Sequence, residues 1–139
     1  MATIADRYTP KQKEIYSDFL SNLETHPLSN DIAKVKNEQS IKQSIRNLLL
    51  TNVGERFFRP YVGSNIYKSL FNFIDNFTMN DIKIYIQDTI KSYEPRAKLI
   101  SVNVYDNNDS GNSVTATIQF SIINTGENAT LNLVLRRVR

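Results

Sequence analysis

The chain has 139 residues, a length that predicts one domain with a small hydrophobic core. Hydrophobic residues make up 40 % of it and charged residues 22 %, ordinary values for a globular protein. Its formal net charge of +3 is too small to indicate a nucleic-acid surface. The absence of cysteine excludes disulfides, thiolate catalysis and zinc sites built on sulfur ligands.

The start of the chain predicts neither a membrane segment nor a secretion signal. No apolar run approaches the roughly 20 residues that span a bilayer. The first residues lack a basic stretch followed by an apolar core. Residues 1–14 are polar and without periodicity, so we expect an N-terminal arm there and a single domain over residues 15–139.

The segment between residues 15 and 36 carries weaker signals. It opens with an apolar cluster too short to distinguish a strand from a helix, made of Ile15, Tyr16, Phe19, Leu20 and Leu23. Residues 26–31 are rich in turn-forming types, which predicts a loop. The apolar residues Ile32, Ala33 and Val35 then indicate a brief edge strand.

A first long helix is predicted from Asn37. Asparagine is a favoured N-cap residue, and Glu38 suits the positive end of the helix dipole. Apolar residues then recur at helical spacing and should form one buried stripe of Ile41, Ile45, Leu48 and Leu49. Gly54 is placed to end this helix as a left-handed cap.

Residues 54–71 mix aromatic, basic and turn-forming residues more densely than any other stretch. Pro60 and the two glycines exclude a continuous helix or a central strand. Because aromatic rings are costly to leave in water, we expect a tightly packed loop. A short helix should follow over Ile66, Leu70 and Phe71.

A second long helix is predicted before Pro95. Thr78 and Asp81 have the spacing of a capping box, with aspartate in place of the usual glutamate. The apolar positions that should form its buried stripe are Ile82, Ile86, Ile90 and Tyr93. The helix has to end at Glu94, because proline disfavours helical geometry at the residue before it.

Glu94, Pro95 and Arg96 place an acid and a base two residues apart at the change from helix to strand. A carboxylate and a guanidinium at such a corner can close it or present a forked charge to a partner. Composition alone favours the closing role, because ion pairs are common and mostly contribute little.

After Pro95 the spacing of apolar residues changes from about 3.6 to 2. Strands are predicted around Ile100, Val102 and Val104, and around Leu131, Leu133 and Leu135. The clearest strand alternates polar residues with Val114, Ala116, Ile118, Phe120 and Ile122. The loops at 106–112 and 124–128 have turn chemistry. We therefore predict an α+β fold of two layers, in which a three-stranded antiparallel meander packs against two main helices.

The sequence gives little support for catalysis. The single histidine, His26, precedes a proline and lacks an orienting group. The acidic loop 106–112 loosely resembles a calcium loop but lacks its final glutamate. A glycosidase needs two carboxyl groups across a cleft, for which Glu55 and Glu94 are the best candidates. A neighbouring arginine would lower a carboxyl pKa, which is wrong for a general acid, so we expect no catalytic residues. The sequence also lacks a histidine-carboxylate cluster with metal-ligand spacing and a glycine-rich phosphate loop, so we expect no metal and no cofactor.

Two separated motifs resemble the small baseplate wedge proteins of contractile-tailed phages, a family related to baseplate components of type VI secretion. The first reads Ile-x-x-Ser-Ile-Arg-x-Leu-Leu-x-Thr-x-x-Gly-Glu-Arg from Ile41 and continues through Arg59 to Ser64. The second is the Glu-Pro-Arg signature ending at Arg96, with an Ile-x-Val-x-Val strand after it. The resemblance covers about residues 26–138.

The resemblance implies a structural component of the virion's tail baseplate, which joins the inner wedge core and templates the first sheath ring. The residues that it implies as partner contacts are Glu94, Pro95, Arg96, Arg56 and Arg59. Expected partners are other baseplate wedge subunits and the tail sheath protein, in a symmetric multi-copy assembly without nucleic acid or membrane. Some members are labelled lysozyme-like, so a lysozyme-like glycoside hydrolase acting on peptidoglycan stays the alternative.

Overall fold

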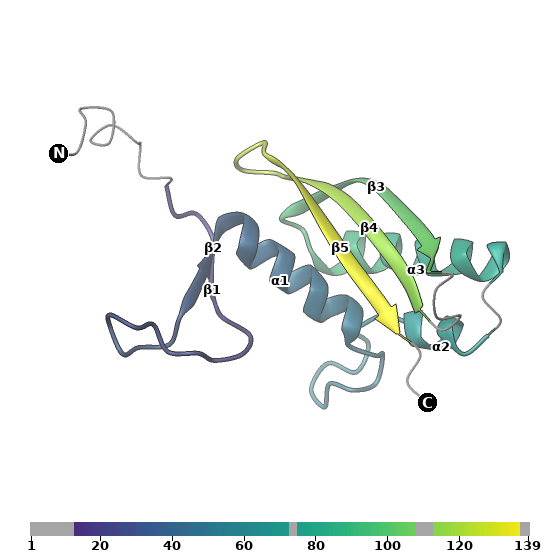
Figure 1. Cartoon of the computed structure of the whole chain (residues 1–139), viewed down its shortest axis with the longest axis horizontal. Coiled ribbons are helices and arrows are strands. Elements are labelled where there is room, and N and C mark those ends of the chain that lie inside the picture. The colour runs from purple at the N-terminus through teal and green to yellow at the C-terminus, as the bar shows by residue number, and fades with distance from the viewer. Residues whose placement is uncertain (1–12, 73–74, 108–112, 137–139) are drawn as a thin grey trace. The chain divides into compact units, whose positions relative to one another are not determined.

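The computed structural model describes residues 13–72, 75–107 and 113–136 (Figure 1). Residues 1–12 of the predicted arm at 1–14 and residues 108–112 of the predicted loop at 106–112 lie outside these residues. The chain divides into two compact units, one up to Ser40 and one from Ile41 onwards. In chain order the elements are β1 (Ser17–Phe19), β2 (Lys34–Lys36), α1 (Asn37–Leu50), α2 (Ile66–Leu70), α3 (Asn76–Tyr93), β3 (Ala97–Asp106), β4 (Ser113–Ile122) and β5 (Asn128–Arg136).

The first unit is built on a two-stranded antiparallel ribbon. β1 and β2 pair with Asp18 opposite Val35, so the apolar cluster that precedes residue 26 contributes a strand rather than a helix. The brief strand expected near Val35 is present as β2. The loop at 26–31 is confirmed, and the backbone N–H of His26 donates to the carbonyl of Asp31 across it.

Asn37 is the first residue of α1 instead of its cap. Its backbone adopts a left-handed conformation with φ of 46°, which asparagine tolerates better than most residues. The side-chain oxygen accepts hydrogen bonds from the backbone N–H groups of Ile15 (2.9 Å) and Tyr16 (3.2 Å). The residue therefore fastens the strand segment that enters β1 to the start of α1.

The stripe predicted for α1 is confirmed, since Ile41, Ile45, Leu48 and Leu49 are all buried. The predicted end is wrong, because the helix finishes at Leu50. There the N–H and hydroxyl of Thr51 both donate to the carbonyl of Asn47. Gly54 has the expected positive φ, but it serves the following loop, where its N–H donates to the carbonyl of Pro60.

The two later helices also correct the predicted boundaries. α2 forms where expected, whereas α3 starts before Thr78 and is capped by Asp75, whose carboxylate accepts from the N–H of Thr78 at 2.7 Å. The buried positions Ile82, Ile86 and Ile90 are confirmed. The fourth predicted position of the stripe, Tyr93, is wrong because it lies at the margin of the core with 37 % of its surface exposed.

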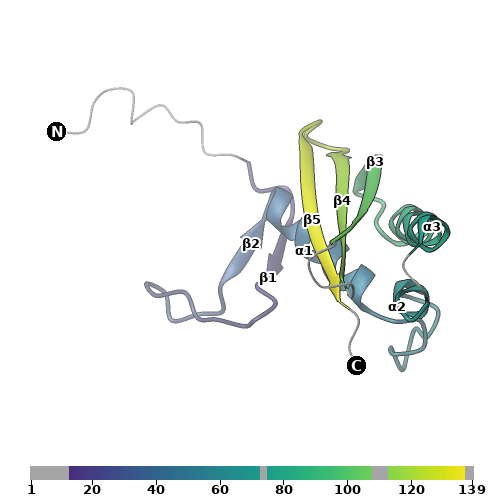
Figure 2. The same cartoon turned by 45° about the vertical axis from the view of Figure 1, so that its right-hand side comes forward.

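The second sheet is an antiparallel meander in the order β3-β4-β5. Five alternating residues of its central strand have no exposed surface, namely Val114, Ala116, Ile118, Phe120 and Ile122. Leu133 and Leu135 of β5 extend this buried face. Figure 2 shows α2 and α3 together on one side of the sheet, and α3 packs against β3. The α+β prediction, with a three-stranded meander and two main helices, is thus confirmed.

β3 departs from simple alternation at Ile100. The register with β4 shifts between Leu99 and Ser101, so Ile100 is the extra residue of a β-bulge and is exposed. Ile100 therefore does not share a face with Val102, as the spacing predicted. The bulge keeps Leu99 and Val102 opposite Phe120 and Ile118, the buried residues of β4.

Within the described parts of the chain, no helix is long and apolar enough to cross a membrane.

Candidate partner-binding sites

Glu94, Pro95 and Arg96 form the corner between α3 and β3. The guanidinium of Arg96 donates two hydrogen bonds to the Glu94 carboxylate, from Nε to Oε1 and from Nη2 to Oε2, both of 2.7 Å. Pro95 restricts the backbone of the short turn that joins the two charged residues. Little conformational entropy is therefore lost when the forked ion pair forms. The corner is consequently closed by its own side chains.

A serine of the first motif completes the pair. Ser44 of α1 donates its hydroxyl proton to Oε2 of Glu94 at 2.6 Å. The motif marks Ser44, but its spacing does not indicate the partner, because Ser44 and Glu94 lie far apart in the sequence. The carboxylate thus connects α1, α3 and β3 at one point.

Burial and hydrogen bonding act in opposite directions on Glu94, which is only 2 % exposed. Burial by itself would raise the pKa of this carboxyl, but the hydrogen bonds from Arg96 and Ser44 and the nearby positive charge lower the pKa below its usual value. The group therefore stays ionised near neutral pH. It is a fixed anion that orients Arg96 and is not available for proton transfer.

Arg96 and Pro95 are the members of the corner that reach the surface. Pro95 is exposed, and 32 % of the Arg96 side chain is accessible. The backbone carbonyl of Arg96 accepts from the N–H of Ile123 at 3.1 Å, which fixes the corner to the turn after β4. The arrangement presents an oriented guanidinium on a rigid support.

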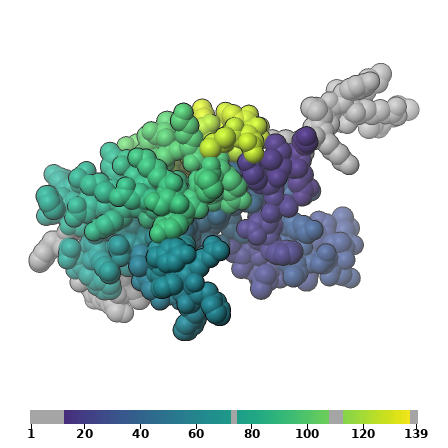
Figure 3. Space-filling model, turned by 180° about the vertical axis from the view of Figure 1, so that it is seen from behind, coloured from purple at the N-terminus to yellow at the C-terminus, as the bar shows by residue number. Residues whose placement is uncertain are grey.

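Arg56 and Arg59 lie in a different place, on the loop between α1 and α2, and both are exposed. One side-chain bond connects this loop to the end of α3, because the hydroxyl of Tyr93 donates to the carbonyl of Tyr61 at 2.8 Å. The loop protrudes as the blue-teal segment in the view from behind (Figure 3).

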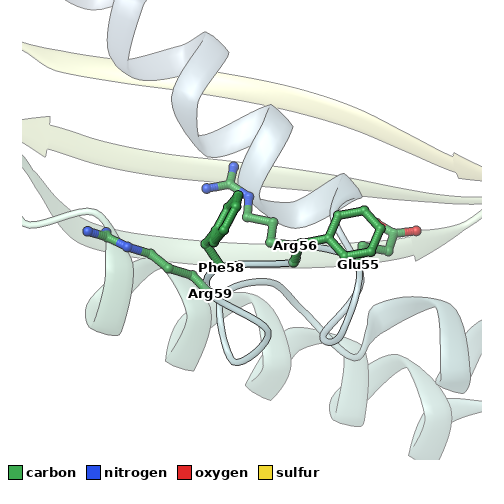
Figure 4. Close-up of a pocket in the computed structure, with 5 residues that line it drawn as sticks. Glu55, Arg56, Phe58 and Arg59 are labelled. Atoms are coloured by element: carbon green, nitrogen blue, oxygen red, sulfur yellow. The ribbon is translucent and has the colours of Figure 1, made fainter.

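The same loop contradicts the prediction of tight packing. Phe57 is 97 % exposed and Phe58 is 99 % exposed, so neither ring contributes to the core. Residues 55–59, which we call the loop tip, line a hollow of about 380 Å³ (Figure 4). The run Arg-Phe-Phe-Arg between Gly54 and Pro60 could have indicated an exposed binding loop. Burial was predicted instead, because exposing an aromatic ring to water costs free energy.

The carboxyl groups considered for hydrolysis have the wrong electrostatics for a general acid. The carboxylate of Glu55 accepts from the backbone N–H (2.8 Å) and the side-chain amide (2.9 Å) of Asn52, and these bonds lower its pKa. A glycosidase acid needs a raised pKa, whereas the pKa is lowered for both Glu55 and Glu94. The described ranges contain no cluster of acidic or histidine side chains suited to a metal ion.

Comparison with known proteins identifies the family of the chain. Residues 35–127, well over half of the chain, match the model of the family described as baseplate wedge protein gp25. The baseplate wedge protein gp25 of Enterobacteria phage T4 is 27 % identical over 123 residues, which cover 88 % of this chain and 86 % of that protein.

Solved structures share the fold. A Geobacter sulfurreducens protein described as a candidate tail lysozyme has a TM-score of 0.68 at 26 % identity, with 73 % of this chain and 92 % of that one covered. A chain of the type VI secretion baseplate complex has a TM-score of 0.63 at 17 % identity, with coverage of 73 % and 93 %. On the evidence of the family model and the phage relative, the chain belongs to the gp25 family of baseplate wedge proteins.

Proposed function

We propose that the chain is a structural subunit of a contractile tail baseplate in the virion, where it joins the inner wedge core and templates the first ring of tail sheath. Family membership supports the baseplate setting. The proposed contact to the wedge core rests on one observation: the buried Glu94 carboxylate holds the guanidinium of Arg96 in one orientation. In this proposal Glu94 and Pro95 set the geometry, and Arg96 meets the partner.

A fixed corner suits assembly because little conformational freedom is lost on binding. The guanidinium does not have to be ordered by its partner, since Glu94 already orients it. Arg56 and Arg59 would add positive charge on a second part of the surface. Symmetric copies of the chain would then repeat both contacts around the baseplate.

The edges of the meander support the sheath part of the proposal. Among the strands that the structure describes, β3 and β5 each pair with β4 alone, and β1 and β2 pair with one another. An edge strand offers main-chain donors and acceptors to which a strand of another chain can bind, with side-chain alternation fixing the register. We infer that one edge of this sheet accepts a strand of the sheath protein.

Peptidoglycan hydrolysis is the alternative function that some family names suggest. No observation in the structure favours it, because the pKa values of the two best carboxyl candidates are lowered by hydrogen bonds. We therefore assign the chain no enzymatic role.

Substitution of Arg96 tests the wedge contact. We expect Arg96→Ala to remain folded and monomeric in isolation but to be missing from wedge intermediates when it replaces the wild-type chain in its own particle. Because Arg96→Ala leaves a buried carboxylate without its main partner, the Glu94→Gln/Arg96→Ala double variant serves as the matched control. Incorporation is measured by quantitative mass spectrometry of purified baseplates.

The double variant separates folding from binding. If the corner serves assembly, both variants are excluded from the wedge although circular dichroism shows both to be folded. If Arg96→Ala unfolds and the double variant is incorporated normally, the corner is only an internal clamp and the proposed contact is wrong.

A further inference from the structure

Two adjacent phenylalanines on the loop tip lie almost entirely outside the fold. Single exposed apolar residues are common on protein surfaces and need no explanation. Phe57 and Phe58 differ from these because both residues are at least 97 % exposed and are adjacent in the sequence, with an arginine on each side. A pair of rings placed in this way contributes nothing to folding, so it calls for another role.

The loop that carries them is held firmly at its base. The N–H of Gly54 donates to the carbonyl of Pro60 at 2.7 Å, which closes the loop directly beneath the tip. Further down, Ser64 donates its N–H to the carbonyl of Thr51 (2.8 Å) and its hydroxyl to the carbonyl of Leu49 (2.7 Å). These bonds fix the loop to the end of α1.

Close backbone packing adds to this rigidity at Gly63. A Cβ atom placed there would lie 2.7 Å from the carbonyl oxygen of Thr51, so only glycine fits between the two arms of the loop. Because the base is fixed before any partner arrives, less freedom has to be lost when the tip binds. The backbone at the base of the loop is thus fixed before binding.

The charges on the loop tip indicate the chemistry of a partner. Glu55 is the only acidic residue between 51 and 65, and its carboxylate is bonded to Asn52 within the loop. Figure 4 shows the Arg59 guanidinium and the Glu55 carboxylate on opposite sides of the loop tip. The rings are consequently flanked by positive charge, which complements carboxylates.

We propose that the loop tip docks into an apolar groove rimmed by carboxylates on a different protein subunit of the baseplate. Phe57 and Phe58 fill the groove, and Arg56 and Arg59 pair with acidic groups at its rim. Aromatic and arginine side chains are the types that dominate the centres of protein interfaces. This inference rests on the proposed function for its setting, and it adds a second contact distinct from the Arg96 corner.

Two other occupants fit the observations less well. A second copy of the chain also carries a net charge of +3, so it is a poorer electrostatic match for a basic tip than an acidic subunit is. A lipid surface is recognised by clusters of about four to eight basic residues, whereas the loop tip has only Arg56 and Arg59.

Photo-crosslinking in the assembled particle tests the occupant. Benzoylphenylalanine replaces Phe58 in the full chain, or Phe77 as the control, because Phe77 is 76 % exposed on α3 away from the loop. We expect the Phe58 probe to link to another baseplate protein, at a peptide with apolar and acidic residues, and the Phe77 probe not to link to that peptide. Links to a second copy, to lipid, or to nothing in particles that contain the chain would overturn the proposal.

Substitutions measure how much the rings contribute. Phe57→Ser/Phe58→Ser should lower the occupancy of the chain in purified baseplates at least tenfold, while Phe77→Ser leaves it unchanged. The thermal midpoint of both isolated variants should match that of the wild type, since the replaced rings are exposed. Normal occupancy of the double variant would contradict the docking role.

Failure of the baseplate role and failure of the loop-tip contact give different results. If the wild-type chain is absent from baseplates, the proposed function itself fails. If the wild type is present and the Phe57→Ser/Phe58→Ser variant is incorporated equally well, the proposed function stands and only the role of the loop tip is wrong.

Discussion

The carboxylate of Glu94 is buried and yet charged, because Arg96 grips both of its oxygens and Ser44 donates to one of them. The sequence predicted the pairing of Glu94 with Arg96, since proline fixes two charged residues on one short turn. It could not predict the contribution of Ser44, which reaches the corner only after α1 has packed in the core. The exposure of Phe57 and Phe58 was also missed, because their burial was inferred from the free-energy cost of exposing an aromatic ring to water.

The electrostatics of Glu94 predict how stability changes with pH. Burial favours the neutral acid, but the bonds from Arg96 and Ser44 outweigh it and lower the pKa in the folded state. A carboxyl whose pKa is lower folded than unfolded stabilises the fold above its unfolded pKa of about 4.3. This stabilisation is lost as the pH falls through the lower, folded pKa.

We therefore expect Glu94→Gln to flatten the acid side of the stability profile. The free energy of unfolding, measured by urea titration at intervals from pH 7 to pH 3, should fall less steeply below pH 4.3 for Glu94→Gln than for the wild type. Glu55→Gln is the control, because its exposed carboxylate is screened by water and should change the profile less. Parallel profiles for Glu94→Gln and wild type would show that the corner is not coupled to folding.

Among the helices and strands, hydrophobic periodicity predicted which residues lie on the buried face of an element. The stripe of α1 and the alternation in β4 were predicted correctly, because each buried position leaves a repeating trace in the sequence. Element ends were predicted less well: Asp75 caps α3 in place of Thr78, and α1 ends before Gly54. The bulge at Ile100 was also missed, because an extra strand residue is defined by the partner strand and not by its own neighbours.

The core between α3 and the meander can be tested by truncation. Ile86 of α3 and Phe120 of β4 have no exposed surface. We expect Ile86→Ala and Phe120→Ala each to lower the free energy of unfolding by roughly 2–5 kcal/mol, the range for large buried side chains. Ile100→Ala is a matched control on β3, since Ile100 is exposed in the bulge.

Thermal and urea denaturation measure these changes directly. An unchanged midpoint for Phe120→Ala would mean that the strand phase assigned to β4 is wrong. A large loss for Ile100→Ala would place that residue in the core and contradict the bulge.

For the molecule as a whole, the family could be inferred from two motifs whose positions the fold explains. The first motif supplies α1, its buried stripe and the base of the protruding loop. The second supplies the corner at which α3 gives way to β3. The proposed contacts to the wedge core and the sheath could not be derived from spacing, because a surface that binds a partner has no periodic pattern in the sequence.

A structural role predicts that the purified chain does not clear peptidoglycan. A general acid needs a raised pKa, and hydrogen bonds lower the pKa of both candidate carboxyls. We expect no loss of turbidity from a suspension of purified peptidoglycan, with hen egg-white lysozyme as the positive control. Clearing by the wild-type chain that disappears in Glu55→Gln would require an enzymatic function.

The most direct measurement of the central claim is a cryo-electron microscopy reconstruction of the intact, uncontracted particle that encodes this chain. We expect the chain to lie in the baseplate, Arg96 to face the wedge core, and one edge of the β3-β4-β5 sheet to pair with a strand of the sheath protein. A reconstruction that places the chain outside the baseplate would contradict the account. So would one in which Arg96 faces solvent and both sheet edges are covered by this chain alone, with sheath protein touching only side chains.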